Sequence, residues 1–188
     1  EHGGVDKLTY ADMEKPKISP YEVLVKVKAC ALNHLDIWVR QGLPGVDIPM
    51  PHILGSDSVG EVAEVGIEVK NFRPGDRVII APGVRCRKCV YCITNHDSMC
   101  NSFKIMGFQV QGGYAEFARA HVDNIIPVSN KLSFEEWASI PLVFLTAWHM
   151  LITRGQLKPG ENVLIHAAGS GIGSAAIQIA RLAGARVI

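Results

Sequence analysis

The sequence predicts an α/β protein in which a β-rich N-terminal domain precedes the start of a doubly wound parallel sheet. Up to about residue 128, short apolar runs alternate with Gly/Pro turns, which favours an all-β or mixed barrel-like domain. From residue 161, an apolar strand, a glycine-rich turn, an alanine-rich helix and a second strand follow one another. That order is typical of a βαβ unit. We therefore predict two domains, residues 1–128 and residues 129–188.

Local patterns predict individual elements within this plan. The stretch YEVLVKVKAC alternates valine with lysine, which indicates a half-buried strand. The following NHLDIWVRQG indicates a short helix that ends at Gly42. Ser133 and Glu136 have the spacing of a capping box, so a helix begins there. Pro141 interrupts that helix, and LVFLTAWHML continues as a second helical segment.

Composition and charge exclude several classes of partner. The 188 residues carry a formal net charge of +1, which provides no basic surface for nucleic acid or for an anionic membrane. No apolar run approaches the roughly 20 residues that a membrane span needs. The chain begins at EHGGVDKLTY without a methionine and stops at GARVI within a predicted strand, so we expect it to be part of a longer protein. We expect a cytoplasmic location.

Four of the five cysteines lie within fifteen residues: Cys86, Cys89, Cys92 and Cys100. In a chain whose sequence has the features of a cytosolic protein, such a cluster favours a metal site over disulfides. A disulfide pair would require an oxidising compartment. The fifth cysteine, Cys30, stands in an apolar stretch, and we expect it to be a small buried hydrophobic residue.

The glycine-rich turn comprises Ala168, Gly169, Ser170, Gly171, Ile172 and Gly173. Small residues between a strand and a helix let the backbone approach a pyrophosphate at the helix N-terminus, so we predict a dinucleotide site. The alternative is a tight packing turn without a ligand. The motif departs from G-x-G-x-x-G, with Ala168 and Ser170 at its first two positions. The residue that selects NAD or NADP lies about 20 residues beyond such a turn, so both cofactors stay open.

These motifs together resemble the medium-chain dehydrogenase/reductase superfamily, which includes zinc alcohol dehydrogenases and quinone oxidoreductases. The resemblance covers essentially all 188 residues and is carried by EHGG, NHLDIWVRQG, ILGSDSVGEV, FRPGDRV, the cysteine cluster, GGYAEF, IPLVFLTAWHML and HAAGSGIGSAAIQIA. It implies a GroES-like N-terminal domain, a Rossmann cofactor domain and an active-site cleft between them. It also implies a homodimer or a homotetramer.

The resemblance implies that the four clustered cysteines hold one structural zinc. Four thiolates complete a tetrahedron and leave no position for water or substrate. An iron–sulfur site fits less well, because a ferredoxin run has three residues and not seven before its last cysteine. We expect Arg85, Arg87 and Lys88 to offset the negative charge of the thiolates, and His96 and Asp97 to be solvated.

The ligands of the family's second, catalytic zinc are replaced. Asn33 stands at the first cysteine position, and Ser56 stands at the histidine position within Gly55-Ser56-Asp57. Residues 140–149 contain no cysteine or acidic residue. An amide and a hydroxyl are poor zinc ligands, so the pattern favours a site without catalytic zinc. Three other residues are candidates for a rebuilt zinc site: Cys30, His34 and Asp57.

Without that zinc, the reaction that the family implies is conjugate reduction of quinones or α,β-unsaturated carbonyls by NAD(P)H. The small-molecule substrate then needs hydrogen-bond donors at its enolate oxygen, which Asn33, His34 and Ser56 can supply. His34 can also deliver a proton, or can simply pack on its helix. Thr146 matches a threonine that contacts the nicotinamide end in relatives. A zinc alcohol dehydrogenase with a rebuilt site and a non-catalytic nucleotide-binding protein are the alternatives.

Overall fold

The computed structural model describes all residues, Glu1–Ile188. The chain folds into two compact units. Unit 1 is Glu1–Ser139 and unit 2 is Ile140–Ile188. The division therefore follows Ser139 and not residue 128, where the sequence pattern changes. The reason is α3 (Phe134–Ala138), which packs against strands of unit 1 through Phe134 and Trp137.

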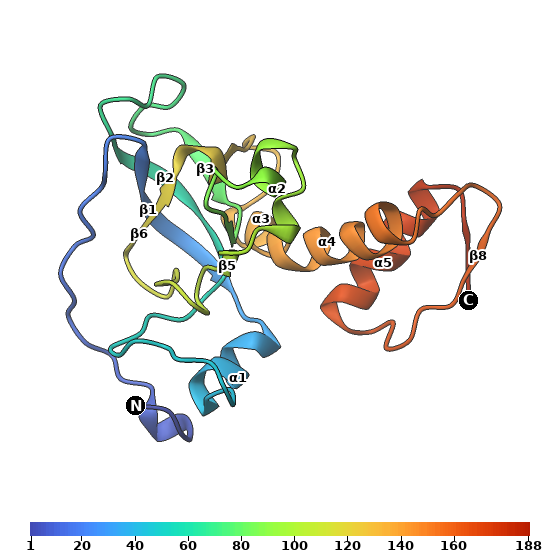
Figure 1. Cartoon of the computed structure of the whole chain (residues 1–188), viewed down its shortest axis with the longest axis horizontal. Coiled ribbons are helices and arrows are strands. Elements are labelled where there is room, and N and C mark those ends of the chain that lie inside the picture. The colour runs from blue at the N-terminus through green and yellow to red at the C-terminus, as the bar shows by residue number, and fades with distance from the viewer. The chain divides into compact units, whose positions relative to one another are not determined.

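Unit 1 is built on a curled antiparallel sheet of five strands in the order β6-β1-β2-β3-β7 (Figure 1). Along the chain, the strands are β1 (Glu22–Ala31), β2 (Asp57–Val65), β3 (Arg77–Ile80), β6 (Phe117–His121) and β7 (Ile125–Pro127). The predicted valine–lysine alternation forms β1: Val23 and Val25 are fully buried, whereas Lys26 and Lys28 are exposed. The main core cluster lies on this sheet and also includes Val62, Val78, Ile80, Met106, Ala118 and Ile125.

Short helices complete unit 1 where the capping signals predict them. Helix α1 (His34–Gln41) ends at Gly42, whose φ of 89° is a conformation that favours glycine. The predicted capping box of α3 is present, because Ser133 Oγ accepts from the backbone N–H of Glu136 and the Glu136 carboxylate accepts from the N–H of Ser133. Two 3₁₀ turns, η1 (Val5–Lys7) and η3 (Val122–Asn124), lie in the connections.

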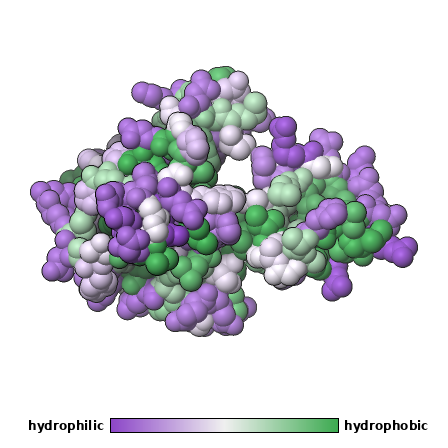
Figure 2. Space-filling view, turned by 90° about the horizontal axis from the view of Figure 1, so that it is seen from below, coloured by the Kyte–Doolittle hydropathy of each residue, from purple (hydrophilic) through white to green (hydrophobic).

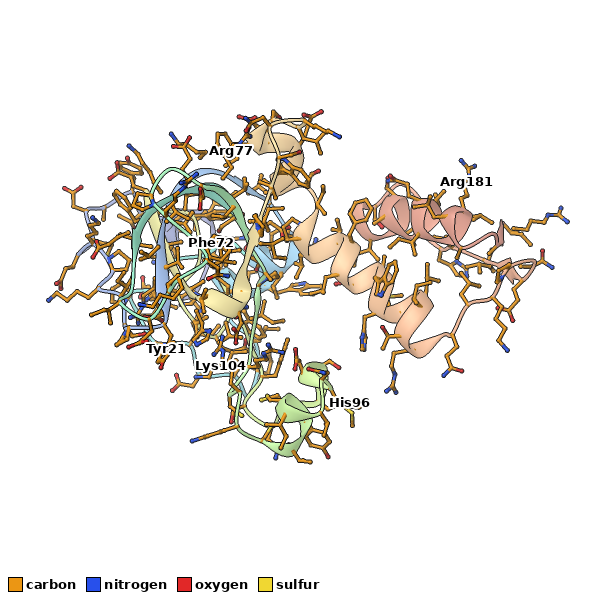
Figure 3. The ribbon with its side chains drawn as sticks, turned by 90° about the horizontal axis from the view of Figure 1, so that it is seen from above. Tyr21, Phe72, Arg77, His96, Lys104 and Arg181 are labelled. Atoms are coloured by element: carbon orange, nitrogen blue, oxygen red, sulfur yellow. The ribbon has the colours of Figure 1, made fainter.

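The four clustered cysteines lie in a small lobe, residues 86–100, which we call the cysteine lobe. Its base is a two-stranded antiparallel pair, β4 (Gly83–Val84) and β5 (Lys104–Ile105). Within it are one helical turn, α2 (Val90–Ile93), and a 3₁₀ turn, η2 (Asp97–Met99). Figure 3 shows the lobe extending away from the sheet, with His96 in the lobe and Lys104 at its base.

Unit 2 contains the predicted βαβ arrangement. It begins with α4 (Pro141–Trp148), which continues as a π-helical segment, η4 (His149–Arg154). Strand β8 (Asn162–Val163), helix α5 (Gly171–Leu182) and strand β9 (Arg186–Val187) follow, and the two strands pair in parallel. Both strands are shorter than the apolar runs predicted, although the N–H of Ile165 also donates to the carbonyl of Ile188.

Helices α4 and α5 pack on each other around a small apolar core in unit 2, formed by Ala147, Ala175, Ala176 and Ile179. Other apolar side chains remain at the surface, and Figure 2 shows hydrophobic residues in green on this face of the molecule. The exposed large apolar side chains of unit 2 include Leu145, Trp148 and Leu182. None of the helices combines the length and the apolar character that crossing a bilayer requires.

Candidate active site and metal centre

A chain of hydrogen bonds joins the start of α1 to the start of β2. Asn33 precedes α1, and its side-chain Nδ2 donates to Asp57 Oδ2 at 2.8 Å. Asp57 opens β2 and is only 1 % exposed. A buried carboxylate needs hydrogen-bond donors, so this contact supplies one donor to Asp57 and orients the Asn33 amide. One N–H of that amide is thereby used and the other is available.

A second carboxylate, Asp36, holds the backbone of Asn33. The N–H of Asn33 donates to Asp36 Oδ2 at 2.8 Å, and the hydroxyl of Tyr114 donates to the same oxygen at 2.6 Å. Asp36 is 7 % exposed, and its other oxygen, Oδ1, has no hydrogen-bond partner. Burial raises the pKa of Tyr114 and the Asp36 carboxylate raises it further, so the hydroxyl keeps its proton.

Sequence reasoning did not assign Tyr114 a role, because its partner is 78 residues away in the chain. The signal that could have indicated a role for Tyr114 was the Gly-Gly-Tyr motif at 112–114, because glycines have no side chain and allow neighbouring groups to pack closely. The tyrosine ring lies against Gly55: a Cβ there would come within 2.4 Å of the ring. Tyr114 therefore belongs to the same cluster as Asn33, Asp36 and Asp57.

Ser56 does not have the geometry that the sequence suggested for it. Its side chain is fully buried, and its hydroxyl donates to the carbonyl oxygen of Met106 at 2.7 Å. A serine hydroxyl has one proton to donate, and here that proton serves the backbone. Ser56 therefore has no donor left for a substrate, and its contact ties the start of β2 to the segment that follows β5.

His34 is exposed at the first position of α1, with its ring edge-on to Trp38 at 4.8 Å between centroids. The contact orients the imidazole without burying it. Both alternatives raised by the sequence therefore keep support, since His34 packs on its own helix and its ring is open to solvent.

The three candidates for a rebuilt zinc site do not gather. The group of side chains that could hold a metal ion is the cysteine lobe, and it includes none of Cys30, His34 and Asp57. The Cys30 thiol lies 3.6 Å from Ser58 Oγ, and burial raises its pKa to about 11. Cys30 therefore stays a protonated, half-buried thiol, close to the small apolar role that the sequence predicts.

The cysteine lobe fits a tetrahedral metal ion. The four Sγ atoms of Cys86, Cys89, Cys92 and Cys100 all lie within 4.8 Å of one another. Cys86 Sγ and Cys89 Sγ lie 3.8 Å and 3.5 Å from Cys92 Sγ. Zinc–sulfur bonds of about 2.3 Å give tetrahedron edges of about 3.8 Å. The sulfurs are thus spaced as a four-thiolate zinc site requires.

Backbone N–H groups of the lobe point at these sulfurs. The N–H of Cys86 donates to Cys100 Sγ at 3.4 Å. Hydrogen bonds from the N–H groups of Lys88 and Cys89 lower the pKa of the Cys86 thiol to about 6. Such bonds favour the thiolate, which is the form that binds metal.

The charged side chains around the lobe differ from the sequence-based expectation. Arg85 pairs with Asp97, which is therefore not simply solvated. Arg87 donates to Asp123 Oδ2 at 3.0 Å, so both arginines face carboxylates and not the sulfurs alone. Lys88 and His96 are exposed. The groups that donate to the sulfurs are therefore backbone N–H groups, which stabilise the thiolate charge.

In unit 2, the glycine-rich turn leads directly into α5. Ser170 caps the helix by accepting from the N–H of Gly173 at 3.0 Å. A Cβ at Gly173 would lie 2.3 Å from the carbonyl oxygen of Ala167, so the turn requires glycine there. A Cβ at Gly169 would meet nothing within 4 Å. The protein itself does not demand glycine at 169, and the open space suits a group that approaches the backbone.

The remaining residues of the turn are consistent with an anion site. Gly171 and Ile172 are exposed at the first positions of α5, where backbone N–H groups have no partner within the helix. Ala168 is likewise exposed. Val143 of α4 approaches the turn, since its Cγ1 lies 3.0 Å from a Cβ built at Gly171. Thr146, three residues further along α4, lies half-buried on the same side of that helix.

Comparison with known protein families assigns this chain to one of them. Residues 19–130 match the alcohol dehydrogenase GroES-like domain. The chain belongs to that family, within the medium-chain dehydrogenase/reductase superfamily that its motifs resemble.

Its relatives include alcohol dehydrogenases and a quinone oxidoreductase. An alcohol dehydrogenase of Geobacillus stearothermophilus is 39% identical over 183 residues, covering 96% of this chain and 53% of the relative. A quinone oxidoreductase of Mus musculus is 33% identical over 189 residues, covering 100% and 49%. The crystal structure of an NAD-dependent alcohol dehydrogenase superposes with a TM-score of 0.96 at 48% identity, covering 100% and 55%. The chain spans about half the length of the curated relatives it matches.

Proposed function

We propose that this protein is an NAD(P)H-dependent reductase of quinones or α,β-unsaturated carbonyls that uses no catalytic zinc. The observation that carries the proposal is the Asn33–Asp57 contact of 2.8 Å. At the positions where zinc relatives hold ligands, this chain has an amide bound to a buried carboxylate and a serine hydroxyl bound to backbone. Neither group is a good zinc ligand.

The amide of Asn33 suits the stabilisation of a developing enolate oxygen. One of its N–H groups is held by Asp57, which leaves the other oriented and free to donate. Asp36 accepts from the backbone N–H of Asn33 and is itself held by the hydroxyl of Tyr114, so the donor is fixed before substrate arrives. We assign Asp57 to orienting this amide.

His34 supplies the proton in this scheme. Its exposed imidazole lies next to Asn33 in the chain, and imidazole is a common general acid. The nicotinamide supplies the hydride when it is bound. In unit 2, we assign Ala168, Gly169, Ser170, Gly171, Ile172 and Gly173 to the pyrophosphate, and Thr146 to the nicotinamide end. Either NAD or NADP fits this part of the protein.

The cysteine lobe has a separate role in this proposal. We assign Cys86, Cys89, Cys92 and Cys100 to one structural zinc, which would order the lobe. A four-thiolate site has no open position for a substrate, so it takes no part in turnover. Reduced cysteines of this kind suit the cytoplasm, where we place the protein as a homodimer or homotetramer.

The alternative of a zinc-dependent alcohol dehydrogenase is favoured by the names of two of the relatives. The test counts zinc in the full-length protein and screens NADH and NADPH oxidation with quinones, enones and aldehydes. One zinc per chain, with chelator-insensitive reduction of enones or quinones, supports the proposal. Two zinc ions with chelator-sensitive alcohol oxidation support the alternative. Nucleotide binding without turnover would indicate a non-catalytic protein.

A variant pair sharpens this test. Asn33→Ala removes the proposed enolate donor, so we expect kcat to fall about 100-fold, as for the loss of one oxyanion donor. Asn71→Ala removes an exposed asparagine of the same unit and should leave kcat unchanged. Equal activity of the two variants would refute the role of Asn33.

A further inference from the structure

Arg87 occupies the centre of the first cysteine pair, Cys-Arg-Lys-Cys, in a left-handed backbone conformation with φ of 63°. Residues with a Cβ adopt this conformation at a cost, and glycine is the usual choice. A large side chain at this position is therefore unexpected unless it makes contacts that a glycine could not make.

The backbone and the side chain of Arg87 reach in two directions. Its backbone N–H donates to the sulfur of Cys92. In its guanidinium group, Nε donates to Asp123 Oδ2 at 3.0 Å and Nη2 donates to Asn124 Oδ1 at 2.8 Å. One residue thus joins the metal-binding sulfurs to η3, which is 36 residues further along the chain.

Asn124 carries this connection into the sheet. It is 5 % exposed, and its Nδ2 donates to the carbonyl oxygens of Ala81 at 2.8 Å and Gly83 at 2.7 Å. Ala81 directly follows β3, and Gly83 begins β4 at the base of the lobe. Asp123 is also approached by Arg85 at 3.8 Å, and Arg85 itself pairs with Asp97 inside the lobe. The guanidinium of Arg87 is therefore fastened to a buried point of unit 1.

We propose that Arg87 is a positioning residue that couples metal binding by the four cysteines to the docking of the cysteine lobe on the sheet. A metal ion bound by the four sulfurs fixes the conformation of the turn that contains Arg87. The guanidinium group of Arg87, which we call the fork, then points at Asp123 and Asn124. Coupling between two events is reciprocal. The same fork, held by the sheet, therefore keeps the turn closed and slows loss of the ion.

The test uses the full-length, zinc-loaded protein and the variant Arg87→Gly. Glycine accepts the left-handed backbone and keeps the N–H to Cys92, so only the fork is removed. We expect zinc transfer to a chromophoric chelator to become roughly tenfold faster, because three charge-assisted hydrogen bonds are lost, to Asp123, to Asn124 and to the carbonyl oxygen of Arg85. Hydrogen exchange of the backbone amides at 89–100 should also become faster.

Two further variants define what is lost. Arg87→Lys keeps the positive charge without the fork, so it should also release zinc faster. Lys88→Ala removes an exposed positive charge from the same turn and should behave like the parent protein. In each variant, the absorption spectrum of the cobalt-substituted protein reports whether the four-thiolate site is still formed.

Several results would overturn the proposal. Unchanged zinc release and amide exchange in Arg87→Gly would show that the fork does not couple the lobe to the sheet. Equal acceleration in Lys88→Ala would assign the effect to net charge. Loss of the four-thiolate cobalt spectrum in Arg87→Gly would show that Arg87 builds the site itself. Relief of backbone strain by glycine would slow release, whereas the greater backbone flexibility of glycine would speed it. Arg87→Lys keeps a Cβ, so parent-like release in Arg87→Lys would assign faster release in Arg87→Gly to backbone flexibility and would overturn the proposal.

Discussion

Two alanine substitutions in the glycine-rich turn, Gly173→Ala and Gly169→Ala, separate the packing of this turn from its proposed contact with a dinucleotide. At Gly173, an added Cβ would lie 2.3 Å from the oxygen of Ala167 and 2.8 Å from the Cα of Ala168. Both are backbone atoms, so the turn or the start of α5 has to move. At Gly169, an added Cβ would meet nothing within 4 Å.

The expected magnitudes follow from these distances. Ordinary Cβ contacts begin at 3.4 Å, so the overlap at Gly173 is about 1 Å. Overpacking of this kind costs about 1–3 kcal/mol, and the greater helix propensity of alanine offsets up to about 1 kcal/mol. We expect Gly173→Ala to lower the free energy of unfolding by about 1–2 kcal/mol. Gly169→Ala should leave it unchanged or raise it slightly, because alanine restricts the unfolded chain.

Gly169→Ala, which should not destabilise the protein, should nevertheless weaken cofactor binding. If a pyrophosphate lies against the backbone of Gly169, the added methyl occupies its space and weakens NADH binding at least tenfold, or about 1.4 kcal/mol. Urea unfolding measures the stability of both variants, and NADH fluorescence titration measures their affinity. Parent-like affinity in Gly169→Ala would refute the placement of the pyrophosphate. Parent-like stability in Gly173→Ala would refute the packing argument.

Three further predictions concern unit 1. Tyr114→Phe removes a donor to the buried Asp36 carboxylate and should destabilise the protein by about 1–3 kcal/mol in urea unfolding, and an unchanged midpoint would contradict this. In metal-free protein, iodoacetamide should modify Cys86 with a rate that rises through about pH 6, because hydrogen bonding from the Lys88 N–H lowers its pKa to about 6. Cys30, with a pKa of about 11, should stay unmodified at pH 7 by mass spectrometry. Removal of metal by a chelator should increase proteolysis within 86–100 before the sheet unfolds, and simultaneous cleavage elsewhere would count against a separately ordered lobe.

Local signals were sufficient for many elements. The valine–lysine alternation predicted β1, and Gly42 correctly marked the end of α1. The Ser133–Glu136 spacing predicted the capping box of α3, and the strand–turn–helix pattern predicted the βαβ unit. Each of these signals involves residues that are close together in the sequence. For such residues, the local backbone geometry alone decides which side chains and backbone groups come into contact.

The sequence by itself also determined the donor chemistry: four thiols at metal spacing, and an amide and a hydroxyl where the family resemblance implies zinc ligands. Only the tertiary structure decided how those donors are used. Strand pairing and loop packing bring Tyr114 to Asp36 and Arg87 to Asp123, and they direct the Ser56 hydroxyl to the backbone of Met106. These partners are 36 to 78 residues apart, and no local pattern encodes them, because such contacts depend on how the whole sheet packs.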